Sequence, residues 1–117
     1  MTTKKSDPTE PKTFDYFIDC SVEILNPHDG KPVPTAVDSK EMVTRGFVLG
    51  TILSEEKSDN FKPMKAWILA QKFFQTKKVG IDADDFDKLK KSVENSSRWY
   101  PFVIGQLMEY LEGLRRE

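Results

Sequence analysis

The sequence has few side chains that could carry out covalent chemistry. Cys20 is the only cysteine and His28 the only histidine, so one chain can form neither a disulfide nor a zinc site built from several cysteines. A serine or threonine nucleophile needs a supporting base, and no nucleophile elbow, phosphate-binding loop or dinucleotide fingerprint occurs. We therefore expect a protein that is not an enzyme and that uses no metal and no cofactor. Cys20 is expected to be a small buried residue, and His28 a solvated turn residue.

The sequence also lacks an excess of charge of one sign. Its 18 basic and 19 acidic side chains give a net charge of -1, which provides no general attraction to phosphate backbones or anionic lipid. Nucleic-acid binding is therefore disfavoured. One alternative stays open, in which the chain is a nucleic-acid-associated regulator that contacts phosphate through Lys88, Lys90 and Lys91.

Long apolar runs are missing as well. Nowhere do about 18 consecutive apolar residues occur, as a membrane-spanning helix would need, and residues 1–13 lack the apolar stretch of a signal peptide. The single cysteine is compatible with a reducing compartment. We expect a cytoplasmic protein with no membrane segment.

What is present suits one small folded domain. The 117 residues are 38% hydrophobic and 11% aromatic, which is enough apolar material for a single core. Residues 1–13 offer no apolar anchor to offset the entropy of ordering them. The sequence predicts a flexible tail over residues 1–13 and a single α+β domain over residues 14–117.

The domain should begin with a β-strand. Apolar side chains occupy every second position over residues 14–24, which is the period of a half-buried strand. Phe17 interrupts the polar face and indicates that part of this face is also covered. Residues 26–31 contain an Asp-Gly turn signal, so residues 33–37 are expected to return as a short edge strand limited by its prolines.

A helix is expected to follow at Asp38. Glu41 stands three residues after this candidate N-cap, as in a capping box, and Val37 and Met42 occupy the positions of a hydrophobic staple. The helix should run to about Ser54.

Two glycines and a second helix come next. Gly46 and Gly50 lie one turn apart and would allow another element to approach closely. Asn60 is the expected cap of the second helix, with Pro63 in its first turn and its end at residues 77–80. Its strongly apolar side consists of Met64, Trp67, Ile68, Phe73 and Phe74.

Start signals of the same kind predict two more helices. Asp82 and Asp85 suit the cap and first turn of a third helix, with Ile81 and Phe86 as its staple, and Pro101 suits the first turn of a fourth. The predicted buried stripe of the third helix is Phe86, Leu89 and Val93. The fold class is mostly helical α+β, with an N-terminal strand or β-hairpin packed on about four α-helices.

An acidic cluster precedes the third helix but does not match a calcium site. An EF-hand loop that began at Asp82 would need glycine at its sixth and glutamate at its twelfth position, and the chain has Asp87 and Val93 there. These carboxylates are expected to stabilise the helix N-terminus. Carboxylate pairs elsewhere leave open a second alternative, a small enzyme with an unrecognised carboxylate site.

The aromatic run from Trp99 to Phe102 is the most concentrated apolar feature outside the helix faces. Trp and Tyr are enriched at interface hot spots, and an isolated strand must pack on helices or pair with a second copy. We therefore expect a non-catalytic protein-protein interaction module whose partner is a second copy or a host protein. The expected binding residues are Tyr16, Phe17, Trp99, Tyr100 and Phe102.

The order of these segments over residues 38–113 resembles small phage and prophage proteins of uncharacterised function. The segments that carry the resemblance are FVLGTIL at 47–53, KAWILAQK at 65–72, VGID at 79–82 and WYPFVIGQLMEYLE at 99–112. The resemblance implies a phage-encoded accessory, assembly or host-modulating protein in the bacterial cytoplasm or the virion. It implies no catalytic residues, and the strand region lies outside it.

Overall fold

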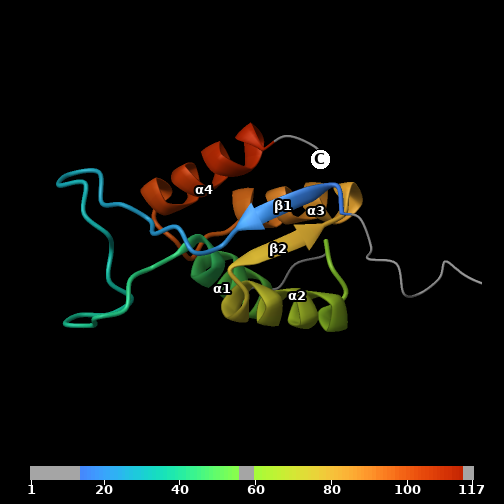
Figure 1. The fold of residues 1–117 in the computed structure, drawn as a ribbon, viewed down its shortest axis with the longest axis horizontal. Coiled ribbons are helices and arrows are strands. Elements are labelled where there is room, and N and C mark those ends of the chain that lie inside the picture. The colour runs from blue at the N-terminus through green and yellow to red at the C-terminus, as the bar shows by residue number, and fades with distance from the viewer. Residues whose placement is uncertain (1–13, 56–59, 115–117) are drawn as a thin grey trace, which may run out of the picture.

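The structure is a computed structural model that describes residues 14–55 and 60–114. Over these residues the chain forms four helices and one two-stranded antiparallel sheet, which confirms the mostly helical α+β class (Figure 1). The predicted tail, residues 1–13, lies outside the described residues. In chain order the elements are β1 (Tyr16–Asp19), α1 (Arg45–Glu55), α2 (Pro63–Gln75), β2 (Lys78–Ile81), α3 (Ala83–Glu94) and α4 (Pro101–Gly113).

The first strand pairs within the chain, but with a partner that the sequence did not predict. β1 lies antiparallel to β2, with Ile18 opposite Val79. Residues 33–37 therefore do not pair with β1. The expected return after the turn is limited to a bridge between Leu25 and Pro32 and to the hydrogen bond from the Val33 amide to the Ile24 carbonyl. The expected end of the second helix at residues 77–80 is wrong, because α2 ends at Gln75. Alternate burial along β2 shows the period of a strand, but four residues are too few to display it against the helical pattern that precedes them.

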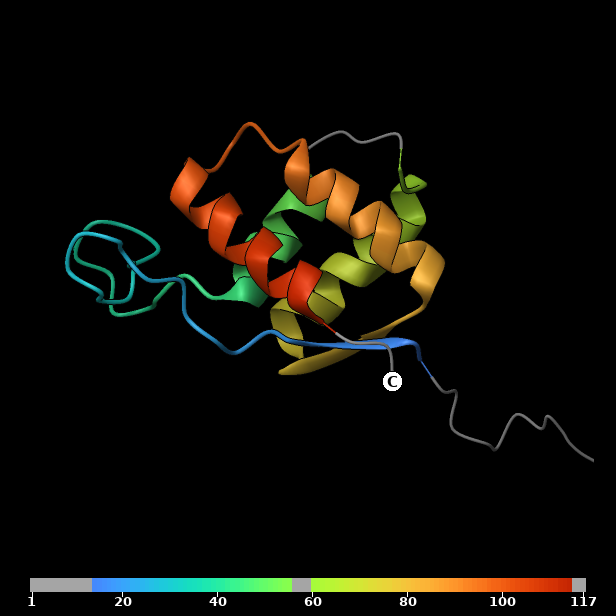
Figure 2. The ribbon, with the colours of Figure 1, turned by 90° about the horizontal axis from the view of Figure 1, so that it is seen from above.

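The sheet covers one side of the helices (Figure 2). On its other face the rings of Phe14 and Phe17 meet edge to face, with their centroids 6.2 Å apart. The Phe14 ring lies where a Cβ at Gly80 would be. Phe17, whose position predicted additional cover on this face, is thus partly covered by an aromatic residue of the same chain.

Between β1 and α1 the chain forms an irregular arm, residues 20–44, that projects beyond the helices (Figures 1 and 2). Its three extended segments are joined by backbone hydrogen bonds: the Ile24 amide donates to the Val43 carbonyl at 2.8 Å, and the Val43 amide donates to the Val33 carbonyl at 2.6 Å. The predicted turn is confirmed, since the Asn26 amide donates to the Lys31 carbonyl. Only isolated bridges form along the arm, because its prolines lack amide donors.

Two residues of α4, one turn apart, hold the arm and the end of β1. The side-chain amide of Gln106 accepts from the Leu25 amide at 3.0 Å and donates to the Leu25 carbonyl at 2.6 Å. The Tyr110 hydroxyl accepts from the Asp19 amide at 2.8 Å, and the Arg45 guanidinium lies 3.5 Å from the centre of the Tyr110 ring. Gln106 and Tyr110 therefore attach α4 to the arm and to the end of β1.

The first helix begins six residues later than predicted. Asp38 is not its cap: it has a positive φ of 63° in an exposed turn, and Val37 is 92% exposed instead of forming a staple. The cap is Thr44, whose hydroxyl accepts from the Phe47 amide at 3.1 Å. The stretch between them is extended because its backbone pairs with the rest of the arm, as in the hydrogen bond from the Thr35 amide to the Glu41 carbonyl. Tertiary pairing overrides the local capping signal.

The other helix starts agree better with the local signals. In α2 the N-cap position belongs to Lys62, and the predicted cap Asn60 instead donates from its side chain to the Ser92 hydroxyl at 3.1 Å. Pro63 does occupy the first turn of α2, Asp82 is the N-cap residue of α3, and Pro101 begins α4. These three positions confirm the predictions.

A single core lies between the helices and the inner face of the sheet. The close approach predicted at the two glycines of α1 is confirmed: a Cβ at Gly46 would collide with the Phe73 carbonyl oxygen, and one at Gly50 with the Phe74 ring. The predicted stripe of α3 is buried as expected. The core consists of Ile18, Cys20, Ile24, Val43, Val48, Leu49, Ile52, Leu53, Phe61, Leu69, Ala70, Phe73, Val79, Ile81, Phe86, Leu89, Val93, Val103, Leu107 and Leu111.

Candidate protein-binding surface

The helix α2 has apolar side chains on two faces, and only one of them is in the core. The buried face consists of Leu69, Ala70 and Phe73 and packs against α1. The other face remains in solvent, and we call it the α2 apolar face. Its members and their exposed fractions are Met64 at 68%, Trp67 at 54%, Ile68 at 44% and Phe74 at 45%.

These four residues correct the sequence-based view of α2. All four were expected on the same apolar side as Phe73, yet Phe73 alone of that set is buried. Helical spacing separates them, because Phe73 follows Leu69 on one side of the helix while Trp67 and Ile68 turn to another. One helix can bury only the side that faces its neighbours, so the second apolar stripe stays outside the core.

Phe74 links the α2 apolar face to a row of aromatic rings beneath it. Its ring meets that of Phe47 at a centroid distance of 6.2 Å and an angle of 65°. Phe47 in turn meets Trp99 at 6.0 Å and 81°. The α2 apolar face therefore continues into packed aromatic structure and is anchored on α1.

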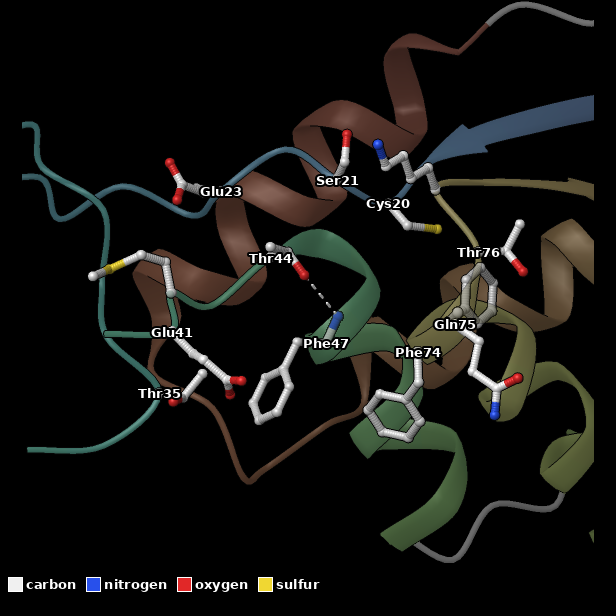
Figure 3. A pocket seen from close by; sticks show the side chains of 13 residues that line it. Cys20, Ser21, Glu23, Thr35, Glu41, Thr44, Phe47, Phe74, Gln75 and Thr76 are labelled. Atoms are coloured by element: carbon white, nitrogen blue, oxygen red, sulfur yellow. Dashed lines mark hydrogen bonds between the residues drawn. The ribbon is translucent and has the colours of Figure 1, made fainter. Parts of the chain in front are cut away.

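A groove adjoins this end of α2, between the helix and the arm (Figure 3). It has a volume of about 440 Å³ and is open to solvent. Arm residues such as Thr35 and Glu41 form one wall, and Phe74 and Gln75 form the other, with Phe47 between them. We call this the arm groove. Its lining combines apolar and hydroxyl side chains with the carboxylates of Glu23 and Glu41 and with Lys77. This mixture suits a peptide or side chain better than a reacting small molecule.

The segment of the chain that contains α2 is basic, although the chain as a whole is not. Residues 60–81 contain five lysines and no acidic residue, while the whole chain has a net charge of -1, so the remainder of the chain is net negative. Lys65 is paired with Asp85 at 2.9 Å. The exposed Lys62, Lys72 and Lys77 form no ion pair with another described residue. The five lysines are Lys62, Lys65, Lys72, Lys77 and Lys78.

The predicted binding residues of the strand are largely engaged within the chain. Tyr16 stacks on Phe86, with ring centroids 3.9 Å apart and planes 14° apart. Phe17 contacts Phe14 and lies 5.1 Å from the Lys78 ammonium group. Since β1 is also paired with β2, the unpaired strand that suggested these residues does not occur.

The predicted aromatic junction lies on the far side of the helices from the sheet (Figure 2). Trp99 is half-buried, and its indole nitrogen is buried with no acceptor among the described residues. Phe102 packs against the core, whereas Tyr100 is 74% exposed and stacks on Phe102. The structure therefore does not join the strand residues and the junction into one surface, and Tyr100 alone of the junction is widely accessible.

The lysines of the nucleic-acid alternative lie on α3 among acidic residues. Lys88 and Lys91 are exposed. Lys90 is half-buried, 3.9 Å from Asp87 and 5.0 Å from the centre of the Phe86 ring. The arrangement is that of a mixed-charge helix surface.

The reactive groups of the described chain do not assemble a catalytic centre. Burial raises the pKa of the Cys20 thiol to about 12, so the thiol is protonated at neutral pH and is a poor nucleophile. Hydrogen bonds from Ser21 lower the pKa of Asp19, which is opposite to the shift of a general acid. Among the described residues no group of three or more metal-ligating side chains occurs.

Comparison of the chain with protein-family models, with curated proteins and with solved structures finds no match. Within the described residues, no helix has the length and hydropathy to cross a bilayer. The resemblance to phage proteins therefore stays a prediction.

The α2 apolar face is the feature that sequence reasoning missed. One signal for it was present: apolar residues at 64, 67, 68, 69, 70, 73 and 74 cover more of the helix than a single buried stripe requires. A second signal was the absence of acidic residues around them.

Proposed function

We propose that the chain is a non-catalytic protein-binding module and that the α2 apolar face is its main contact surface. The observation that carries the proposal is the exposure of four large apolar side chains along one helix. Exposed groups of large apolar side chains on soluble proteins mark interaction sites more often than single exposed residues do. Trp67 is the natural anchor, because Trp contributes strongly to interface hot spots.

The proposal moves the contact surface away from the residues expected from the sequence. Tyr16, Phe17 and Trp99 are occupied by contacts within the chain, so replacing them would disturb the fold as well as any interface. Tyr100 is exposed and remains a candidate for a secondary contact. A phage-encoded accessory or host-modulating role stays part of the proposal and is supported by the sequence resemblance alone.

Neither alternative gains a specific observation from the structure. The α3 lysines lie beside acidic residues, as in the pair of Lys90 and Asp87. The carboxylates near the start of α3, including Asp85, lie in a shallow hollow that they share with Lys65 and Lys88. A protein-binding role explains the exposed apolar residues directly.

Site-specific photocrosslinking tests the proposal. Trp67 is replaced by a photoreactive phenylalanine analogue, and the labelled protein is irradiated in a lysate of cells that naturally produce it. Matched controls carry the same analogue at Tyr100, in the junction, and at Lys91, on the surface of α3. We expect discrete protein adducts from position 67, weaker or no adducts from position 100, and none from position 91.

Two outcomes would contradict the proposed surface. Equal adduct patterns at all three positions would indicate non-specific contact, and adducts confined to position 100 would move the interface to the junction. Each variant is first checked by circular dichroism and thermal unfolding. Because Trp67 is more than half exposed, its replacement should leave the unfolding temperature close to that of the wild type.

A further inference from the structure

We infer that the α2 apolar face binds an acidic amphipathic helix of another protein. The inference rests on the proposed function and adds the chemistry of the partner. It combines the apolar stripe with the basic frame around it: a partner that buries Trp67 and Ile68 necessarily approaches the lysines of the same segment. The occupant must therefore carry apolar residues on one face and carboxylates beside them.

The dimensions of the surface fit a helix. Met64 and Phe74 are ten residues apart on α2, which corresponds to about 15 Å along the helix axis. A partner helix of about three turns covers this length with apolar residues at i, i+3 or i+4, and i+7. At the Phe74 end the arm groove, of about 440 Å³, continues the surface. It can receive an apolar side chain from the end of the partner beside Phe47 and Phe74, whereas Glu23 and Glu41 in its lining would oppose a carboxylate there.

The charges fit an acidic partner. Lys65 and Lys72 are seven residues apart and so lie along the same edge of α2, with Lys62 before the helix and Lys77 after it. Lys65 already has a carboxylate partner in Asp85. The ammonium groups of Lys62, Lys72 and Lys77 have none among the described residues, and partner carboxylates placed along this edge would neutralise them.

The same charges argue against a second copy of the chain as the occupant. A symmetric dimer places identical patches against each other. Two α2 segments would then bring together two copies of Lys62, Lys65 and Lys72, with no acidic residue between residues 60 and 81. Juxtaposed like charges oppose association, so this face is better suited to another protein than to self-association.

Two synthetic helical peptides test the inference. Both are about 14 residues long, or four turns, and share one apolar face; one has glutamate at all flanking positions and the other lysine. Binding is followed through the fluorescence anisotropy of a dye attached to the end of each peptide, so that the protein keeps both of its tryptophans. We expect the glutamate peptide to bind at least about tenfold more tightly than the lysine peptide, with an affinity that falls as salt rises.

A pair of charge reversals supplies the matched control. Lys72→Glu lies at the edge of the α2 apolar face, and Lys91→Glu makes the same change at an exposed position of α3. The first should weaken binding of the glutamate peptide several-fold, and the second should leave the affinity unchanged. Ile68→Ser should abolish binding of the peptide without lowering the stability of the protein.

Several results would overturn the inference. Equal affinity for the two peptides would show that the partner need not be acidic, and failure of both peptides to bind would show that it is not a helix. In either case, adducts at position 67 in the crosslinking experiment would still support the proposed function. Tighter binding to vesicles containing phosphatidylserine than to the glutamate peptide would assign the face to a membrane surface. Light scattering that shows a dimer converted to a monomer by Trp67→Ala would assign it to a second copy.

Discussion

The close approach of α1 to its neighbours makes Gly46 the most informative position for testing the fold. A Cβ added there would meet the carbonyl oxygen of Phe73, and it would lie 2.8 Å from the Cβ and 3.2 Å from the carbonyl oxygen of Cys20. Two of these three neighbours are backbone atoms, which cannot rotate away as a side-chain end could. The perturbation is Gly46→Ala, a single added methyl group.

The expected loss follows from two opposing effects. Overpacking a well-filled core costs about 3 kcal/mol where backbone must shift. Alanine is favoured over glycine inside a helix by up to about 1 kcal/mol, and less at Gly46 because it is the second residue of α1. The net prediction is a loss of about 2 kcal/mol in the free energy of unfolding, or about 8 °C in Tm for a domain of this size.

The same substitution at Gly105 is the control. Gly105 lies within α4, and apart from its chain neighbours and the nearby backbone of its own helix no atom lies within 4 Å of the position its Cβ would take. Gly105→Ala should therefore raise stability by about 1 kcal/mol. Urea unfolding of both variants, followed by far-UV circular dichroism, measures the difference. A Gly46→Ala protein as stable as the wild type would refute the close contact between α1, α2 and the end of β1.

Two further predictions concern the arm and the buried thiol. Gln106→Ala removes both hydrogen bonds to Leu25 and should lower the free energy of unfolding by about 1–2 kcal/mol. In hydrogen exchange the Leu25 amide should exchange faster than in the wild type, while the Leu89 amide in α3 should not change. Unchanged exchange at Leu25 would contradict the contact. Burial raises the pKa of Cys20 to about 12, so a thiol reagent at mildly alkaline pH should react slowly with the folded protein and quickly in urea. The thiol of the unfolded chain ionises at a lower pH than the thiol of the folded protein, so ionisation favours unfolding. The stability of the wild type should therefore fall relative to that of Cys20→Ala as the pH rises from about 9 to 12. If the stabilities of the two proteins depended on pH in the same way, the raised pKa of Cys20 would be contradicted.

Helix starts could be predicted where the local signal and the tertiary structure agree. Asp82 and Pro101 begin α3 and α4 as expected, because the residues after them pack directly into the core. Asp38 has an equally good local signal. After Asp38 the chain stays extended because of backbone hydrogen bonds within the arm, including those of Thr35 and Val43. These bonds join segments that are apart in the sequence, so a local sequence pattern cannot predict them.

The partner of β1 could not be found from local patterns at all. β2 has only four residues, and its two buried residues, Val79 and Ile81, fit the end of a helix as well as a strand. Its pairing with β1 joins segments about sixty residues apart in sequence. The nearer segment at residues 33–37 had the lower cost of loop closure, but Pro34 within it and Pro32 before it cannot supply ladder donors.

The candidate site was missed for a related reason. The sequence pattern places Met64, Trp67, Ile68, Phe73 and Phe74 on one apolar side of the helix. Such a pattern shows that residues are apolar but not which of them face a neighbour. The exposed face becomes visible only once Leu69, Ala70 and Phe73 are seen to fill the contact with α1.

This division of α2 allows stability and binding to be separated by mutation. Phe73 is buried, so its truncation to alanine should cost about 3–5 kcal/mol. Met64, Trp67 and Ile68 are exposed and lie outside the core cluster, so polar substitutions there should scarcely change stability. A polar substitution of Phe74 should have an intermediate effect on stability, because its ring covers Gly50. Folding does not require large apolar residues at these exposed positions of α2, whereas binding to a partner would. We therefore expect the polar variants to fold normally and to lose the partner.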